Sequence, residues 1–283
     1  MSKRNTTLTQ KQVSAFLKPR PRQSHKGLFG TAVVIGGASG MAGAALLAGR
    51  AALKLGAGCV HVGLLDDTAP AVDIVQPELM LHQALNAFRL PRVDVFAIGC
   101  GMGTSVAAQK LLHEALRKEV TLVLDADALN LLALHTDLQD DLRTRTAASV
   151  ITPHPGEAGR LLGVPASQVQ TARVDAAQQL AKKLHCSVVL KGADSVCVTR
   201  DGTTYLNKTG NPGMSAPGMG DVLTGMIAAF IAQGLGPDQA LLLAVHLHGA
   251  AGDALAEKGV GVGMTATEIT EWARWLINQW QSQ

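Results

Sequence analysis

The feature that most constrains the fold of this 283-residue chain is a short strand that ends in glycines and runs into a helix of small residues. Residues 31–35 are rich in β-branched side chains, Gly36-Gly37 stops them, and an alanine-rich segment extends to about Leu55. Residues 93–98 repeat the pattern, with a glycine turn at residues 99–104 and a helix to about Lys118. Strands that alternate with helices build a sheet covered by helices. We therefore expect an α/β fold.

Length and composition favour one domain that spans residues 1–283, with an irregular or partly helical N-terminal arm at residues 1–26. No internal stretch resembles a linker rich in serine, proline or charge. Hydrophobic residues make up 47% of the chain but aromatic residues only 3%. The core must therefore consist of alanine, valine, leucine and isoleucine, which suits helices packed closely on a parallel sheet.

Charge, cysteine spacing and hydropathy exclude several classes of protein. The formal net charge of +3 is too small to indicate a nucleic-acid-binding protein. The cysteines lack the spacing of a zinc site or a disulfide framework, so we expect reduced core residues at Cys59, Cys100, Cys186 and Cys197. No segment has about 18 unbroken apolar residues, and the first residues lack the apolar run of a signal peptide. We expect a cytoplasmic protein that binds no membrane.

Two carboxylates follow the strand predicted at residues 120–124, in the segment Asp125-Ala126-Asp127-Ala128-Leu129-Asn130. In open α/β sheets, ligands bind at the carboxyl ends of the strands. Both aspartates are therefore candidate ligand contacts. The alternative is that Asp127 caps the following helix while Asp125 holds a neighbouring loop.

The strand predicted at residues 150–152 leads to His154, which has a proline on each side. Because both prolines restrict its backbone, we expect a rigidly presented imidazole that contacts a ligand, although single histidines are more often structural. Glu157 opens the next helix. It is either a partner of the helix dipole or an outer group for a hydrated magnesium ion on phosphates.

The strand predicted at residues 187–191 ends at Lys191, followed by Gly192-Ala193-Asp194-Ser195. Lys191 is a candidate neighbour of a phosphate or ribose, and the alternative is a lysine that only extends from a strand end into solvent. Residues 196–199 and 203–206 are predicted to form an edge hairpin, and residues 164–185 one amphipathic helix. His246 and His248 lie two apart on a predicted helix, so they cannot share a metal, and we expect packing in the core or at an interface.

A glycine-dense loop at residues 210–221 runs into a long apolar helix. Its glycines allow backbone N–H groups to face an anion, and the helix adds the positive end of its dipole. The loop therefore predicts an anion site. Asp221 lies at the first turn of the helix, where it would either take a proton from a bound ligand or only stabilise the helix by about 0.3–1 kcal/mol.

These motifs together resemble those of a known enzyme family. Gly218-Met219-Gly220-Asp221 is similar to the Gly-x-Gly-Asp anion-hole motif of ribokinase-like enzymes. Over nearly the whole chain, a larger set of segments resembles the ADP-dependent NAD(P)H-hydrate dehydratase family, namely residues 36–45, 125–130, 152–157, 191–194 and 210–214. The resemblance implies a ribokinase-like three-layer α/β/α fold with a mostly parallel central sheet and an antiparallel edge hairpin.

The resemblance also implies two sets of ligand contacts. For the adenine nucleotide, ADP before the reaction and AMP after it, these are Lys191, Gly192, Ala193, Asp194, Ser195 and Gly220. For the hydrate they are Ala44, Gly103, His154 and Asp221. All except Ala44 also follow from strand ends or glycine turns that meet at one edge of the sheet. We expect Lys191→Ala to weaken ADP binding before it lowers stability.

The implied activity is that of a lyase that repairs hydrated nicotinamide cofactors. The (S)-hydrates of NADH and NADPH (NADHX and NADPHX) lose water while ADP becomes AMP and phosphate, with Mg²⁺ assisting. Asp221 would take the proton of the hydrate hydroxyl as that oxygen attacks the terminal phosphoryl group. The family further implies a homotetramer and an NAD(P)H-hydrate epimerase as metabolic companion. The alternatives are an ATP-dependent small-molecule kinase on the same scaffold and a silent nucleotide-sensing module.

Overall fold

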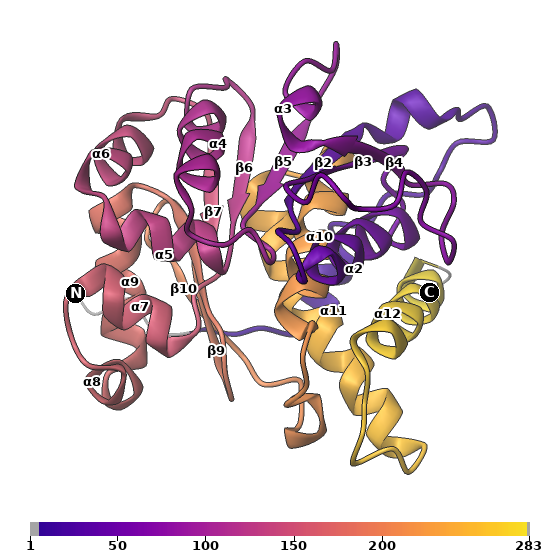
Figure 1. Ribbon diagram of the computed structural model, residues 1–283. Coiled ribbons are helices and arrows are strands. Elements are labelled where there is room, and N and C mark those ends of the chain that lie inside the picture. Colours follow the sequence, from indigo (N-terminus) through magenta and orange to yellow (C-terminus); the bar gives the residue numbers. More distant parts are fainter. Residues whose placement is uncertain (1–5, 282–283) are drawn as a thin grey trace.

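The computed structural model describes residues 6–281 and is built around one long sheet (Figure 1). The strands are β1 (Thr6–Thr7), β2 (Thr31–Gly36), β3 (Cys59–Leu64), β4 (Met80–Gln83), β5 (Val95–Ile98), β6 (Thr121–Leu124), β7 (Ser149–Ile151), β8 (Ser187–Leu190), β9 (Ser195–Val198) and β10 (Thr204–Asn207). Their order across the sheet is β1-β10-β9-β8-β7-β6-β5-β2-β3-β4. The strands from β4 to β8 in this order are all parallel, and β9 is antiparallel to both of its neighbours. The predicted mostly parallel sheet with an antiparallel hairpin is confirmed.

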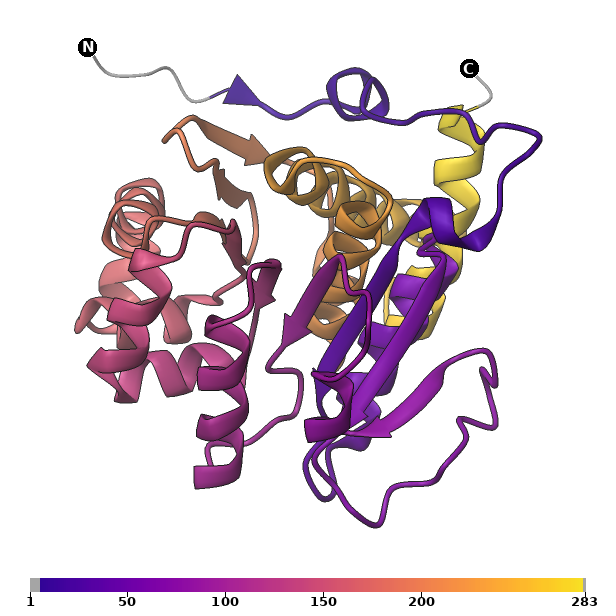
Figure 2. The same cartoon turned by 90° about the horizontal axis from the view of Figure 1, so that it is seen from above.

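The two edges of the sheet differ from the prediction. The hairpin of β9 and β10 is not the edge, because Thr6–Thr7 of the N-terminal arm pairs with Tyr205 and Leu206 (Figure 2). A two-residue strand has too little pattern to be found in sequence. At the other edge, Met80–Gln83 forms β4 beside β3, a strand that was not predicted from the sequence. Residues 1–5 of the predicted arm lie outside the described residues.

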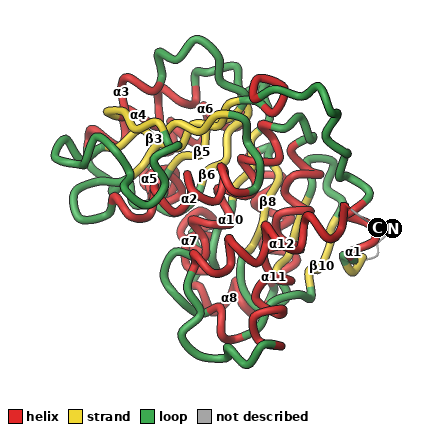
Figure 3. Tube along the Cα trace, turned by 90° about the vertical axis from the view of Figure 1, so that its right-hand side faces the viewer, coloured by secondary structure: helices red, strands yellow, loops and turns green. Residues whose placement is uncertain are grey.

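Helices cover both faces of the sheet (Figure 3). The apolar core on one face includes residues of α2 (Ala42–Lys54), α10 (Met219–Ala232), α11 (Pro237–Glu257) and α12 (Ala266–Gln281). The other face is covered by α3 (Ala84–Ala87), α4 (Val106–Leu116), α5 (Asp127–Leu134), α6 (Thr136–Thr144), α7 (Pro155–Leu162), α8 (Ala166–Thr171) and α9 (Arg173–Leu184). Short elements are α1 (Gln10–Ser14), η1 (Lys26–Phe29) and η2 (Pro212–Met214). The fold therefore has three layers.

Small residues let α2 and α10 pack closely. A Cβ atom at Gly225 would lie 2.1 Å from the carbonyl oxygen of Ala48, so α10 has room only for glycine there. Ala45, Ala48 and Ala52 of α2 are fully buried. This agrees with the expectation that a core of small residues suits closely packed helices, and the contact holds α10 against α2.

One predicted helix was wrong in its length. Residues 164–185 form α8 and α9 with a break at Ala172, whose backbone is not helical (φ −129°, ψ 52°). The amphipathic pattern continues through both helices, so periodicity alone cannot reveal a break of one residue. Between residues 6 and 281, no helix is long and apolar enough to cross a membrane.

Candidate active site

The chain changes direction across the sheet between β2 and β5, and the loops after these two strands meet there. From β2 it continues outward to β3 and β4, and then returns to the other side of β2 as β5. The backbone N–H of Gly37 donates to the carbonyl of Cys100 at 2.9 Å, and that of Ala38 donates to Gly101 at 2.6 Å. Such a switch point is where open α/β sheets bind ligands.

A buried ion pair lies next to this switch point, at the ends of β6 and β8. Lys191 Nζ lies 2.5 Å from Asp125 Oδ1, and the Thr224 hydroxyl of α10 donates to Asp125 Oδ2 at 2.9 Å. Burial alone would raise the pKa of Asp125, but Lys191 and neighbouring hydroxyl groups hold it below its ordinary value. Burial lowers the pKa of Lys191, but the carboxylates of Asp125 and Glu157 outweigh this effect and raise the pKa above its ordinary value. Lys191 and Asp125 therefore both stay charged.

This ion pair changes what is expected of Lys191→Ala. The Asp125 side chain is only 1% exposed, so removal of Lys191 would leave a buried carboxylate without its counter-ion. The structure therefore leads us to expect that Lys191→Ala lowers stability as well as nucleotide binding, which revises the predicted order of the two effects. Sequence spacing could not reveal the pair, because the two residues are 66 positions apart.

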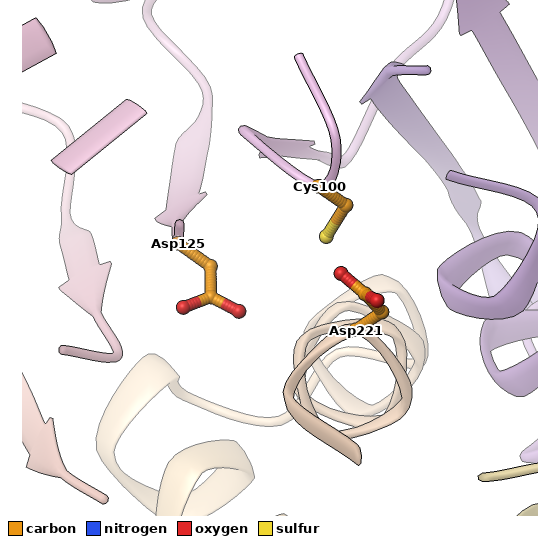
Figure 4. A group of neighbouring side chains, drawn as sticks. All are labelled: Cys100, Asp125 and Asp221. Carbon is orange, nitrogen blue, oxygen red and sulfur yellow. The ribbon is translucent and has the colours of Figure 1, made fainter. Parts of the chain in front are cut away.

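Asp221 lies in the first turn of α10, near both Asp125 and Cys100 (Figure 4). Burial raises the pKa of Asp221 to about 6, although a hydrogen bond with the Cys100 thiol opposes the change. A carboxylate with a pKa near 6 is deprotonated at neutral pH, yet it is a stronger base than an ordinary aspartate. The site therefore holds a group suited to accept a proton.

His154 and Glu157 form a capping box at the start of α7. The imidazole Nδ1 accepts from the Gly156 N–H at 2.9 Å, and Nε2 lies 3.3 Å from Glu157 Oε1. Burial and the charges of Lys191 and Arg160 lower the pKa of His154, so the ring is neutral at pH 7. The side chain is 50% exposed, which leaves one part of the ring open to solvent. Contact with a ligand stays a prediction.

Glu157 connects His154 to the buried ion pair. Its Oε2 accepts from the backbone N–H of His154 at 2.7 Å and lies 3.9 Å from Lys191 Nζ. His154, Glu157, Lys191, Asp125 and Asp221 consequently form one continuous series of neighbours, although they come from four separate segments. The structure brings together the residues at positions 154, 191 and 221 as the sequence predicted.

A cavity of about 500 Å³ opens next to this series. All six residues predicted to contact the nucleotide line it, namely Lys191, Gly192, Ala193, Asp194, Ser195 and Gly220. The opposite wall comes from residues 207–212 and from Val245, His248 and Gly249 of α11. The volume is of the size that small-molecule sites have. His248, expected to pack in the core, lines this cavity, whereas His246 is buried and contacts Asn207 at 3.0 Å.

The residues predicted to contact the hydrate lie beside this cavity rather than in its wall. Ala44 faces the loop after β5, where a Cβ atom at Gly101 would lie 3.0 Å from the Ala44 Cβ. The Gly103 N–H donates to Asp127 Oδ2 at 2.8 Å. Asp221 contacts the same loop through Cys100. Gly103 therefore lies in the same loop that Ala44 and Asp221 contact, and His154 lies on the far side of the ion pair.

The Gly103 bond also corrects the alternative roles of the two aspartates. The N-cap position of α5 is Ala126, with φ 48°, so Asp127 does not cap the helix. Asp127 holds the loop after β5, and Asp125 holds Lys191. In that alternative, Asp125 rather than Asp127 was expected to hold a neighbouring loop. Residue spacing along the chain does not reveal how close the loops after β5 and β6 lie to one another.

Only part of the glycine-dense loop has backbone N–H groups available for the predicted anion site. The Gly210 N–H donates to Asp253 at 2.9 Å and the Gly213 N–H donates to Asn211 at 3.0 Å, so these groups are already engaged. The first backbone bond of α10 runs from Val222 N to Gly218 O. The N–H groups of residues 219–221 precede that bond and have no acceptor within the helix. They are the ones suited to an anion.

The carboxylates fit a magnesium ion that is bound mainly through phosphate and water. Asp125 Oδ1 accepts from Lys191 and Oδ2 accepts from Thr224, so both oxygens are already engaged in hydrogen bonds. Cys100, Asp125 and Asp221 do place three potential ligand atoms within 4.8 Å of one another. Burial raises the pKa of Cys100 well above its usual value, however, and a protonated thiol is no ligand for Mg²⁺, which prefers oxygen. An outer position of Glu157 toward magnesium stays a prediction.

Sequence reasoning missed three residues of the site. Cys100 was predicted to be only a reduced core residue; it is free and buried as expected, but it contacts Asp221. Asp253 holds the glycine loop and His248 lines the cavity, although the α11 pattern indicated packing alone. The position of Cys100 between two glycines at a strand end was the one available signal.

Comparison with known proteins gives a consistent result. The profile of the family described as NAD(P)H-hydrate dehydratase matches residues 32–274. An ADP-dependent (S)-NAD(P)H-hydrate dehydratase of Neisseria meningitidis is 40% identical over 98% of this chain and 95% of its own length. A bifunctional NAD(P)H-hydrate repair enzyme of Escherichia coli is 38% identical over 94% of this chain, which spans about half of that protein (51%).

A solved structure supports the same relationship. The crystal structure of an ADP/ATP-dependent NAD(P)H-hydrate dehydratase from Bacillus subtilis, co-crystallised with ATP and Mg²⁺, superposes with a TM-score of 0.88. It is 31% identical, and the match covers 98% of this chain and 99% of that chain. The predicted ribokinase-like fold is confirmed by such matches.

Proposed function

The chain belongs to the NAD(P)H-hydrate dehydratase family, and we propose that it uses ADP to convert the (S)-hydrates of NADH and NADPH back to the reduced cofactors. The hydroxyl oxygen of the hydrate bonds to the terminal phosphorus of ADP, and AMP leaves. The new carbon–oxygen–phosphorus ester then loses phosphate and a proton, which restores the ring double bond. The products are NAD(P)H, AMP and phosphate, and the enzyme is a carbon–oxygen lyase.

The observation that carries this proposal is the position of Asp221 relative to Gly220. Gly220 lines the cavity together with Lys191, while Asp221 follows it in the first turn of α10 with its pKa raised by burial to about 6. A ligand whose phosphates reach the N-terminus of α10 would therefore have its reacting end beside a proton acceptor. Proton transfer by one positioned group supplies roughly 10²–10⁴-fold in rate.

We assign the nucleotide to the cavity on the basis of its wall. The loop Lys191–Ser195 and Gly220 face it from one side, and the free N–H groups at the start of α10 complete an anion site. A Cβ atom at Gly220 would lie 3.2 Å from Lys191 Nζ, so glycine keeps the lysine close to the helix start. Donors in this position would stabilise the charge that develops on the phosphoryl oxygens during transfer.

The hydrate would occupy the side of Asp221 that faces the loop after β5. Ala44 and Gly103 border that loop, and His154 would contact the same substrate from beyond the ion pair. A neutral His154 can orient a substrate through hydrogen bonds, while its helix cap keeps the ring in place. Asp221 then takes the hydroxyl proton as the oxygen attacks phosphorus.

Mg²⁺ would arrive with the nucleotide, and Glu157 would hold one of its waters. When bound, the ion offsets charge on the phosphates. The crystallisation of the B. subtilis protein with ATP and Mg²⁺ supports this, and ADP is the nucleotide in the name of the N. meningitidis relative. We further propose that the protein is cytoplasmic and forms a homotetramer. Sedimentation of the purified protein would test the homotetramer. The E. coli relative is named as bifunctional, which supports our proposal that a second repair enzyme acts together with this one. We propose that this companion is an NAD(P)H-hydrate epimerase.

Product analysis tests the proposal. Purified protein is mixed with (S)-NADPHX and Mg²⁺, with ADP or ATP in parallel, while the absorbance of the reduced nicotinamide is followed and nucleotides are separated by chromatography. The proposal expects NADPH, AMP and phosphate in equal amounts with ADP. A stable phosphorylated product would instead identify a small-molecule kinase. Nucleotide binding without turnover of either hydrate would identify a sensing module.

A further inference from the structure

Cys100 is held in one position by the backbone around it. It follows β5 between Gly99 and Gly101, whose φ angles of 123° and 59° suit glycine. Its carbonyl accepts from the Gly37 N–H at 2.9 Å, and a Cβ atom at Gly36 would lie 2.2 Å from that oxygen. The residue is fully buried. Little room is left for the loop to move, so the direction of the side chain is set by the fold.

The side chain of Cys100 points toward Asp221 (Figure 4). Its sulfur and one carboxylate oxygen from each of Asp125 and Asp221 lie within 4.8 Å of one another, and an interaction between the thiol and Asp221 contributes to the pKa shifts of both groups. Asp125 already accepts from Lys191 and Thr224. The thiol is thus positioned to donate to the Asp221 carboxylate, which Lys191 does not contact directly.

We propose that Cys100 is a positioning residue for the proton acceptor: its thiol donates a hydrogen bond to Asp221, orients that carboxylate and favours its charged form. This inference rests on the proposed role of Asp221. Burial and the two nearby carboxylates raise the pKa of Cys100 well above its usual value, which keeps the sulfur protonated and able to donate at every working pH. A donor to a carboxylate lowers its pKa, so the bond opposes the effect of burial on Asp221.

Other charged groups around Asp221 also influence its pKa. They are Asp125 after β6, Asp127 at the start of α5 and Lys191 after β8. Two of these are carboxylates, which raise the pKa of Asp221, and Lys191 lowers it. None of the three changes when Cys100 is replaced. A change in the titration of Asp221 in a Cys100 variant would therefore report the lost thiol.

The first experiment compares Cys100→Ala with Cys100→Ser. Serine keeps an O–H donor at this position, whereas alanine removes it. With saturating ADP and hydrate, we expect Cys100→Ala to move the acid limb of the kcat profile upward by about 0.5–1 pH unit and to lower kcat near pH 6 about 2–5-fold. Cys100→Ser should keep the limb near its original position. ADP affinity, measured by calorimetry, should stay within about twofold in both.

Cys197→Ala is the matched control, because Cys197 is equally buried but lies in β9, away from Asp221. It should leave the profile unchanged. A profile of Cys100→Ala that equals the original, or equal displacements in the alanine and serine variants, would overturn the inference, since a packing role predicts either result.

A second measurement does not need turnover or a stable alanine variant. The infrared S–H stretching band of Cys100, assigned by its loss in Cys100→Ser, should shift as the pH passes through about 6 and Asp221 titrates. A band that does not respond to pH overturns the inference even in an active enzyme. A responsive band in a protein without dehydratase activity would leave the contact intact and contradict only the proposed function.

Discussion

The substitution Asp221→Asn separates a proton acceptor from a simple helix-start residue, because the two roles predict opposite changes in stability. Burial raises the pKa of Asp221 from 3.8 to about 6, so the native protein binds this proton more tightly than the unfolded chain does. That stabilisation is complete below about pH 4 and is lost as the pH rises through about 6. At pH 8 the charged carboxylate leaves the fold less stable by up to about 3 kcal/mol.

Asparagine removes the charge without changing the shape. It also weakens the contact with Cys100, so we expect a net gain in the free energy of unfolding of about 1–3 kcal/mol at pH 8, or about 2–6 °C in melting temperature. At pH 4 the gain should vanish. Turnover should fall by roughly 10²–10⁴-fold, or about 3–5 kcal/mol in activation free energy, while ADP binding stays largely intact.

Thermal melts between pH 4 and 8, together with steady-state rates, provide the assay. Asp137→Asn is the control, because Asp137 is an exposed acid in the first turn of α6. A helix-start carboxylate contributes about 0.3–1 kcal/mol, so this control should lose stability slightly. If Asp221→Asn also loses stability at pH 8 and keeps its turnover, Asp221 is a helix-start residue and the reasoning is refuted.

Further substitutions, each with a matched comparison, test the packing and charges around the site. Lys191→Met should lower the free energy of unfolding in urea by about 3–5 kcal/mol, because Asp125 loses its buried partner, and adding Asp125→Asn should recover much of the loss. Equal stability of the single and double variants would contradict this account of the ion pair. Gly225→Ala should cost at least about 1–3 kcal/mol in thermal melts, because its Cβ atom would meet a backbone oxygen of α2. Gly43→Ala, with no atom within 4 Å of its added Cβ, should instead gain about 0.5–1 kcal/mol.

Much of the site was predictable because its residues follow strands whose carboxyl ends meet at one edge. Lys191 and Asp125 come directly after such strands and His154 follows β7 within three residues, so their meeting needs only the parallel order of β6, β7 and β8. Asp221 was found through the glycines that precede its helix. Local sequence is sufficient where chemistry depends on strand ends and helix starts.

Contacts between distant segments could not be predicted in this way. Cys100 and Asp221 are far apart in sequence, and their contact depends on how closely α10 packs on the sheet through Gly225 and Ala48. The pairing of Thr6–Thr7 with β10 likewise depends on where the arm crosses the sheet. Such distances arise from packing between layers, and hydrophobic periodicity describes each element separately.

The most direct test of the central claim follows the hydroxyl oxygen of the substrate. (S)-NADPHX prepared in ¹⁸O-water carries the label in that hydroxyl, and single-turnover reactions with ADP are analysed by mass spectrometry of the released phosphate. Attack of this oxygen on the terminal phosphorus, with Asp221 taking its proton, predicts one ¹⁸O atom in each phosphate. Unlabelled phosphate, with the label released into water, would contradict the account.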